Sequence, residues 1–384
     1  MEVLYRGFDG LDISFQGHIG HGFCRALEKS KEQAQKFRRE EFLEWGDVGM
    51  LVSESGARGG YAFSVRTELP SAIWFFKKPN PSDPWGVRVS CNSFQLALYG
   101  FSQTKAHIHE TLESWKIGVG VGGESISRVD YAIDFLAPQL ALEPSNFVMH
   151  SNCRRAEHHS EFQLRAQGNS GRVTSVTVGK MPGRQIIVYD KRAEVIEKRK
   201  PGWFSIWDAA REKSRKPRLN YSDPKESRVW RVEARAGKKH LKERWAIRTW
   251  EDLNERLGDA FAHAFDAVRY AAPTSDSNRA RWPNDALWDM ARRQIGADLF
   301  EMRSFVEPGA VKLVQLDAYD QMLASQIRGL LISRAAANGI EAPELAQFAM
   351  ANAKEIVSQI KSGEFDFERR LMISSGRVRV LYGR

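Results

Sequence analysis

Short stretches in which apolar and polar residues alternate recur through the first 240 residues of the chain. Alternation of this kind is typical of β-strands that bury one face. It predicts strands over residues 11–15, 61–65, 73–76, 87–90, 128–135, 173–178, 185–189 and 229–235. Because Gly, Pro and Asn turns separate several of these runs, we expect an antiparallel sheet.

Other segments have apolar residues at helical spacing. This spacing predicts a long helix over residues 25–45, another over 102–117, a charged helix from residue 192, and a mostly helical chain after about residue 250. We therefore expect an α+β fold in two parts: an antiparallel-sheet domain over residues 1–250 and a mainly helical region over 251–384.

Composition narrows the class of protein. The 384 residues are 42% hydrophobic and 27% charged, which is ordinary for a folded protein. No apolar run approaches the roughly 18 residues that a membrane span requires, and the first residues lack the pattern of a signal peptide. The three cysteines, Cys24, Cys91 and Cys153, show no CxxC spacing, which argues against a disulfide framework or a cysteine zinc site. We expect a cytoplasmic protein without membrane partners.

The positive charge is concentrated in one segment. The whole chain has a formal charge of +9, whereas residues 180–244 alone contain 20 Lys and Arg against 9 Asp and Glu, a local charge of +11. Tryptophans and a phenylalanine are interleaved with these cations. Cations neutralise phosphates and aromatic rings stack on unpaired bases, so this segment predicts a surface that binds single-stranded nucleic acid.

Three of the predicted strands each have one polar face. Along these faces lie acids, cations and a tyrosine: Arg128, Asp130 and Asp134 on the first, Tyr189 and Lys191 on the second, and Arg231, Glu233 and Arg235 on the third. If these strands are neighbours, a tyrosine and carboxylates share one surface. Tyrosine can attack a phosphodiester covalently, carboxylates can hold a divalent metal ion that polarises phosphate, and Lys can offset the developing charge.

The spacing of the two aspartates limits this hypothesis. Asp130 and Asp134 are four strand residues apart, roughly 13 Å at ~3.3 Å per residue. Two short side chains cannot bind the same ion across that gap unless a bulge intervenes. We therefore expect at most one of them to be a direct metal ligand, with the other in a structural role.

Four segments occur in an order that resembles a known family. RVDYAID, TSVTVGK, IIVYDKRAEV and RVEARAG are similar to motifs of the Rep_trans-type rolling-circle replication initiators, a group of plasmid and filamentous-phage initiators related to the relaxases of conjugative elements. The resemblance runs from about residue 5 to residue 290. It implies a relaxase-like nicking domain that cuts one strand of origin DNA, forms a 5′-phosphotyrosine link and leaves a free 3′ hydroxyl primer, using Mg²⁺ or Mn²⁺.

The resemblance, taken with the polar strand faces and the basic segment, assigns roles to individual residues. Tyr189 is the predicted nucleophile, with Lys191 and Arg231 as catalytic cations. Asp130, Asp134 and Glu233 are the candidate metal ligands. The residues predicted to hold origin DNA, as a single strand or a hairpin, are Lys180, Arg184, Arg192, Lys198, Arg199, Lys200, Trp203, Lys213, Arg215, Lys216, Arg235, Lys238 and Lys239.

Several alternatives remain open at this level. Tyr131 and Tyr221 are further candidates for the nucleophile. A relaxase for conjugative transfer would use the same chemistry, whereas a non-catalytic DNA-binding regulator or an RNA-binding accessory protein would use only the basic surface. The helical tail is predicted to pack as a small bundle, to form a dimer interface or to dock a host helicase.

One literal match points to a different class of nicking enzyme. His107 and His109 form a His-hydrophobe-His triplet, which in that class lies on a strand and binds metal. Here the surrounding residues have helical spacing, and side chains two apart on a helix diverge by about 200°. We therefore interpret the triplet as a coincidence.

Overall fold

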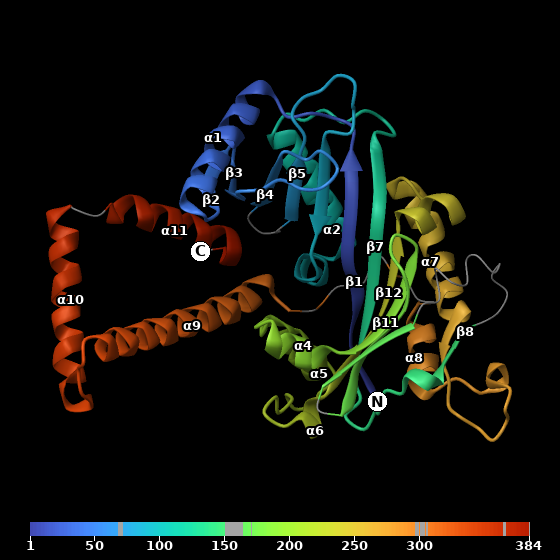
Figure 1. Cartoon of the computed structure of the whole chain (residues 1–384). Helices are drawn as coiled ribbons and strands as arrows, with labels where there is room; N and C mark the ends of the chain where they lie inside the picture. The colour runs from blue at the N-terminus through green and yellow to red at the C-terminus, as the bar shows by residue number, and fades with distance from the viewer. Residues whose placement is uncertain are drawn as a thin grey trace.

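The structure is a computed structural model that describes residues 1–383 except 68–71, 150–163, 170, 296–298, 300–303, 305 and 364–365. Cys153 lies outside the described residues. Within this part of the chain, one antiparallel sheet of eleven strands has the order β2-β3-β4-β5-β6-β1-β7-β12-β11-β10-β9 (Figure 1). Its strands are β1 (Glu2–Phe15), β2 (Glu41–Trp45), β3 (Val48–Val52), β4 (Phe63–Thr67), β5 (Ala72–Phe76), β6 (Val87–Cys91), β7 (Glu124–Leu136), β9 (Leu164–Asn169), β10 (Arg172–Gly179), β11 (Arg184–Asp190) and β12 (Val229–Gly237).

The long strands β1 and β7 form the middle of the sheet. Their register pairs Tyr5 with Asp134, Phe8 with Tyr131 and Gly10 with Asp130, and it shifts between Phe8 and Gly10. A shift of this kind is a β-bulge, which re-aims the extra residue. Asp9 is that residue.

The apolar face of the sheet builds the main core. It is joined in a single buried cluster to four helices, which Figure 1 shows beside the sheet. These are α1 (His21–Phe37), α2 (Ser93–Ser114), α7 (Trp250–Ala267) and α8 (Ala286–Ile295). Because α7 and α8 pack into the same core as the strands, the helical chain after residue 250 begins as part of the sheet domain rather than beside it. A two-stranded sheet of β8 (Phe147–Met149) and β13 (Val268–Tyr270) adjoins these helices.

At one end, helices cover the polar face. There α4 (Lys191–Glu197), α5 (Gly202–Lys213) and α6 (Pro224–Ser227) follow β11 in the chain. A second, smaller cluster seals α4 and α5 onto the sheet, with Trp203 and Trp207 buried against Leu4 and Val229. Arg231 and Asp134 of the central strands lie beneath this cover, in contact with Trp203 and Trp207.

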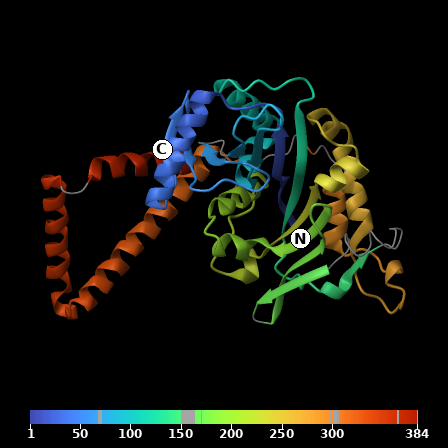
Figure 2. The ribbon, with the colours of Figure 1, turned by 45° about the horizontal axis from the view of Figure 1, so that its top comes forward.

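The last three helices extend away from the sheet as an arm (Figures 1 and 2). They are α9 (Pro308–Ala337), α10 (Leu345–Ser362) and α11 (Phe367–Tyr382). The arm returns to the main body where α11 packs on β2 and β3, with Gly376 so close to the Phe42 ring that a Cβ would lie 2.4 Å from it. The prediction of a helical tail is confirmed.

The predicted helix over residues 25–45 is wrong at its C-terminal end. It ends at Phe37, because Arg38 adopts a left-handed conformation (φ 52°). Residues 41–45 instead form β2, which makes a hairpin with β3 over Gly46 (φ +60°). Charged residues continue through both segments, so helical spacing alone did not reveal the alternation of EFLEW.

Candidate functional site

The three polar strand faces come together, because β11, β12 and β7 are neighbours. One row across the sheet contains Tyr189, Arg231, Asp134 and Tyr5, contributed in turn by β11, β12, β7 and β1. Two residues further along, Glu233 lies opposite Ala132, and then Arg235 lies opposite Asp130. The structure therefore brings Tyr189, the carboxylates and the arginines together on one surface of one sheet, while Lys191 begins α4.

Arg231 and Asp134 form a buried ion pair. The Nε of Arg231 donates to Asp134 Oδ1 at 2.5 Å and its Nη2 donates to Oδ2 at 2.8 Å, while the Trp207 indole also donates to Oδ2 at 2.8 Å. Arg231 also binds Asp9 and lies 4.2 Å from the Trp203 ring. Both members of the pair are 0% exposed. In this position they lock β7, β12 and α5 together.

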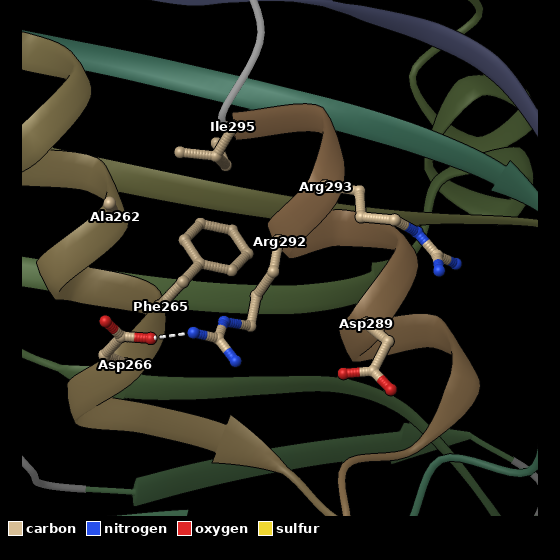
Figure 3. A pocket seen from close by; sticks show the side chains of 7 residues that line it. All are labelled: Ala262, Phe265, Asp266, Asp289, Arg292, Arg293 and Ile295. Atoms are coloured by element: carbon tan, nitrogen blue, oxygen red, sulfur yellow. Dashed lines mark hydrogen bonds and ion pairs between the residues drawn. The ribbon is translucent and has the colours of Figure 1, made fainter.

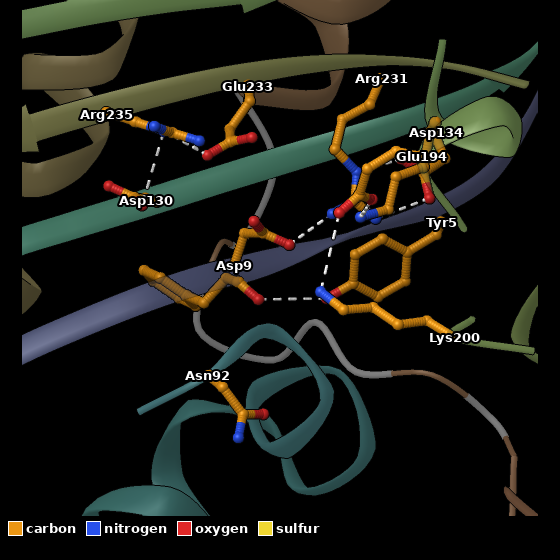
Figure 4. A network of polar contacts seen from close by, with 12 residues as sticks. Tyr5, Asp9, Asn92, Asp130, Asp134, Glu194, Lys200, Arg231, Glu233 and Arg235 are labelled. Carbon is orange, nitrogen blue, oxygen red and sulfur yellow. Dashed lines mark hydrogen bonds and ion pairs between the residues drawn. The ribbon is translucent and has the colours of Figure 1, made fainter. Parts of the chain in front are cut away.

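Asp130 and Glu233 form a second group, in which two arginines bind two buried carboxylates; Figure 4 shows Arg235 between them. Arg128 donates from Nη2 to Asp130 Oδ2 at 2.5 Å, and Arg235 donates from Nε to Glu233 Oε1 at 2.6 Å. Arg235 Nε also lies 3.8 Å from Asp130 Oδ2. Burial raises the pKa of Asp130 to about 7, and the neighbouring Glu233 carboxylate adds to the rise. The hydrogen bonds from Arg128 act in the opposite direction and lower this pKa.

The donor set of this carboxylate pair fits a divalent cation. Glu233 Oε2 is buried and has no hydrogen-bond partner among the described residues. Across the strand, Gly10 lets the Asp130 carboxylate approach the β1 backbone, since a Cβ there would lie 2.7 Å from Asp130 Oδ2. The described residues contain no cluster of three metal-ligating side chains. Mg²⁺, however, is commonly held by one or two carboxylates with substrate phosphates completing its coordination.

Tyr189 lines a cleft of about 580 Å³ beside these carboxylates. The cleft is formed by β10, β11 and α4 together with Asp9 of the bulge and Arg235. Burial raises the pKa of Tyr189 well above 10, although Arg231 opposes the shift. At neutral pH Tyr189 is therefore a neutral phenol.

Three lysines lie on one wall of this cleft around Glu194, of which Figure 4 labels Lys200. Lys191 Nζ lies 2.5 Å from Glu194 Oε2, while Lys198 and Lys200 lie 2.9 and 3.6 Å from Oε1. Burial alone would raise the pKa of Glu194, but Lys191 and the other two lysines lower it to about 2. Burial lowers the pKa of Lys191, and Arg231 adds to this effect. The three lysines outnumber Glu194 itself, while Asp9, Asp190 and Glu197 also line the cleft.

Asp130 gives the fold a measurable pH dependence. Its carboxyl has a pKa of about 7 in the folded protein and 3.8 as a model group, so between these pH values the folded state binds more protons. We expect the free energy of unfolding in EDTA to fall as pH rises from about 4 to about 7. Asp130→Asn should remove the part of this pH dependence that Asp130 contributes. The measurement is the urea midpoint of unfolding of wild type and variant, compared at each pH. Parallel curves for the two proteins would contradict the assignment.

The other candidate tyrosines lie in different surroundings. Tyr131 is buried on the apolar face, where its ring packs on Phe8. Tyr221 stacks on Phe204 with ring centroids 4.0 Å apart, and its hydroxyl donates to Asp208 at 2.8 Å. Neither lines the cleft of Tyr189.

The His107 and His109 pair lies within α2, as the helical spacing predicted. The two residues therefore do not share a strand face. Neither ring is part of a three-residue metal cluster among the described residues.

The residues predicted to bind DNA lie in several environments. Lys198, Lys200 and Arg235 line the cleft of Tyr189. Arg184 is 3% exposed and contacts His263 of α7 on the apolar side, and Trp203 is fully buried under Arg231, so in this structure neither faces solvent. Arg192 donates to Ser227 and to the Tyr221 carbonyl. The others are exposed: Lys180, Arg199, Lys213, Arg215, Lys216, Lys238 and Lys239.

Asp9 and Glu194 are the site residues that sequence reasoning missed. Asp9 enters the site only because of the bulge in β1, and a bulge is not readable from alternation alone. Glu194 is three residues after Lys191 on a charged helix, so the (i, i+3) spacing was the available signal.

A separate hollow of about 350 Å³ lies between α7 and α8 (Figure 3). Arg292 and Asp266 bridge it at 2.5 Å, and Phe265 forms part of its wall. Since α7 and α8 cover the apolar face, this hollow is on the other side of the sheet from Tyr189. It brings no candidate nucleophile near its carboxylates.

Comparison with known proteins gives a similarity of fold to solved structures. No protein-family model matches the sequence, and no curated protein matches it. The fold is similar to a solved structure described as the rolling circle replication initiator protein from Geobacillus stearothermophilus, with 12% sequence identity and a TM-score of 0.41 over 78% of this chain and 99% of that chain. Similarity at this level does not establish a shared function. No described helix combines the length and apolarity needed to cross a membrane.

Proposed function

We propose that this protein nicks and rejoins one strand of DNA through Tyr189 and thereby initiates rolling-circle replication. One observation carries the proposal: a tyrosine lines a cleft with three lysines, next to a buried pair of carboxylates that has an unpartnered oxygen. The cations suit a phosphodiester, the tyrosine is a nucleophile for it, and the carboxylates suit a metal ion.

In this mechanism the Tyr189 oxygen attacks the scissile phosphorus. The new P–O bond to Tyr189 forms as the bond to the 3′ oxygen breaks, so the 5′ phosphate becomes attached to the protein. The phenolic proton passes to solvent base, and the departing 3′ oxygen takes up a proton to become a free hydroxyl. Attack by a 3′ hydroxyl on the phosphotyrosine reverses these steps and rejoins the strand.

The surrounding residues have distinct parts in this reaction. Lys191, Lys198 and Lys200 bind the phosphate groups and offset their charge. Asp130 and Glu233 would hold Mg²⁺ or Mn²⁺, which when bound polarises a phosphate oxygen. Arg231 and Asp134, fully buried and paired with each other, hold the strands that carry these groups rather than contacting DNA.

Covalent capture tests the proposal directly. Single-stranded DNA with candidate origin hairpins is incubated with the protein and Mn²⁺, and the products are separated under denaturing conditions. We expect an adduct that resists denaturation and maps by peptide analysis to Tyr189. A regulator that only binds would retard the DNA in native gels but give no adduct, and this outcome would overturn the proposal.

Removing one carboxylate of this pair should weaken metal binding and, with it, the nicking activity that depends on the metal. We expect Glu233→Gln to lower metal-dependent nicking by roughly 10²-fold or more, because a polarising ion contributes several kcal/mol at the transition state. Mn²⁺ binding, measured by calorimetry, should weaken in parallel, and EDTA should abolish nicking by the wild type. Glu226→Gln, an exposed acid on α6, is the matched control. Unchanged Mn²⁺ affinity in Glu233→Gln would refute the metal assignment.

The same chemistry would serve a relaxase, and the two roles differ in the fate of the 3′ end. In an extract that contains DNA polymerase, the free 3′ end of a plasmid nicked by an initiator primes continuous DNA synthesis. A dimer interface or a helicase-docking surface on the α9–α11 arm remains a prediction.

A further inference from the structure

A second basic cleft lies on the polar side of the sheet, beyond the site of Tyr189. Its volume is about 470 Å³. It is lined by five cations and two aromatic side chains, with a single acid: Arg58, Lys77, Arg88, Lys238, Lys242, Tyr61, Trp85 and Asp83. Only two of the cations, Lys238 and Lys242, come from the basic segment of the sequence.

This second basic cleft belongs to the same face of the sheet as the carboxylates. Ser14 of β1 forms part of its floor and lies opposite Arg88 on one side and Ser125 on the other. Gly10, which faces Asp130, is four residues back along β1, roughly 13 Å at ~3.3 Å per residue. One extended strand of nucleic acid could therefore lie along β1 and reach both clefts.

Most of the charge in the second basic cleft is not neutralised. Lys77 pairs with Asp83 at 2.6 Å. For Arg58, Arg88, Lys238 and Lys242, no carboxylate lies within ion-pair distance among the described residues. Burial lowers the pKa of Lys242, with Lys238 and Arg248 adding to the effect. A site that gathers cations in this way favours an anion.

Arg88 is held as a fixed contact point. Its guanidinium lies 4.2 Å from the Phe75 ring centroid and 5.3 Å from that of Tyr61. Its Nε is buried and has no hydrogen-bond partner in the described part of the chain. A buried donor without a partner costs free energy, and a phosphate oxygen that accepts its hydrogen bond would remove this cost.

Aromatic rings stand beside these cations. Tyr61 and Trp85 are half-buried, so part of each ring remains accessible. Gly59 (φ +89°) and Gly60 (φ +83°) allow the tight turn that places Arg58 and Tyr61 on the rim. Rings next to phosphate-binding cations are the components of a single-strand binding surface.

We propose that the second basic cleft binds a phosphate-and-base segment of single-stranded DNA, the part of the strand that extends beyond the nicking site. Arg58, Arg88, Lys238 and Lys242 contact its phosphates, and Tyr61 or Trp85 stacks on a base. The inference identifies a second contact region for the strand on which Tyr189 is proposed to act, but binding there requires no nicking.

The test compares two variants that each lose one Arg and one Lys. Arg58→Ala with Lys238→Ala removes two exposed cations of the cleft, and Arg25→Ala with Lys29→Ala removes two exposed cations of α1 as the control. Binding to fluorescent single strands is measured by anisotropy in EDTA over a range of salt concentrations. We expect only the cleft variant to lose affinity, with its log–log salt slope reduced by about 1.4, or ~0.7 for each phosphate contact.

Two further measurements distinguish the binding of a strand from the binding of a single nucleotide. Trp85→Leu should weaken strand binding about tenfold without changing the salt slope, since stacking is not ionic. A mononucleotide should bind far more weakly than the strand. The proposal is overturned if cleft and control variants bind the strand alike, or if the cleft variant loses only mononucleotide binding. Adduct formation at Tyr189 is scored separately on a short hairpin, so failure of the nicking proposal gives a different pattern.

Discussion

Tyr189→Phe is expected to eliminate strand cleavage and adduct formation while leaving DNA binding intact. Removing a covalent nucleophile typically costs on the order of 10⁴-fold or more in rate. The ring of Phe fills the same space on β11, and the lysines of the cleft are unchanged, so phosphate binding and folding should persist. Nicking of a supercoiled origin plasmid and anisotropy with a single-stranded origin oligonucleotide measure the two properties separately.

Tyr221→Phe is the matched control for this experiment. Its hydroxyl donates to Asp208 and the Phe204 carbonyl, away from the cleft, so its loss should cost about 1 kcal/mol of stability and leave nicking within a few-fold of wild type. If Tyr221→Phe abolished nicking and Tyr189→Phe did not, the nucleophile would be Tyr221.

Arg231→Met is expected to destabilise the fold severely. It would leave Asp134 buried without its partner and would deprive Asp9 of an ion pair. Loss of one partner from a buried ion pair typically costs about 3–5 kcal/mol. We expect a large fall in the urea midpoint, measured by circular dichroism. Arg218→Ala removes an exposed ion pair with Glu212 and should leave the urea midpoint nearly unchanged.

A companion substitution distinguishes a structural role from a catalytic one. Combining Arg231→Met with Asp134→Leu should recover part of the lost stability, because replacing a buried pair by apolar residues removes the unpaired charge. Near-normal stability in Arg231→Met, together with lost nicking, would instead restore Arg231 as a catalytic cation.

The polar face of the sheet was predictable from the sequence. The alternation in RVDYAIDF and VWRVEAR assigned Asp130, Asp134 and Glu233 to one face, and the spacing along the strand showed that Asp130 and Asp134 could not share an ion. In a strand these properties depend only on the period of two, so neighbouring strands need not be known.

Which of those acids is paired with a cation and which is free to bind an ion depended on the residues that the fold brings beside them. Asp134 is paired with Arg231 and Trp207, whereas Glu233 keeps an oxygen without a partner among the residues that the structure describes. Similarly, the tryptophans interleaved with cations predicted a surface that stacks on bases. Trp203 is nevertheless buried, because α5 packs over the end of the sheet. Local pattern cannot show which side of a helix a later segment covers.

The sequence by itself determined the central strands β7, β11 and β12 with their polar faces, the helical tail and the concentration of charge in residues 180–244. Only the tertiary structure decided which of these cations are buried and which line a cleft. It buries Arg184 on the apolar side and adds Arg58 and Arg88, from outside the basic segment, to a second basic cleft. The physical reason is that strand periodicity is local, whereas a charged cleft is assembled by long-range pairing of β1 with β6 and β7.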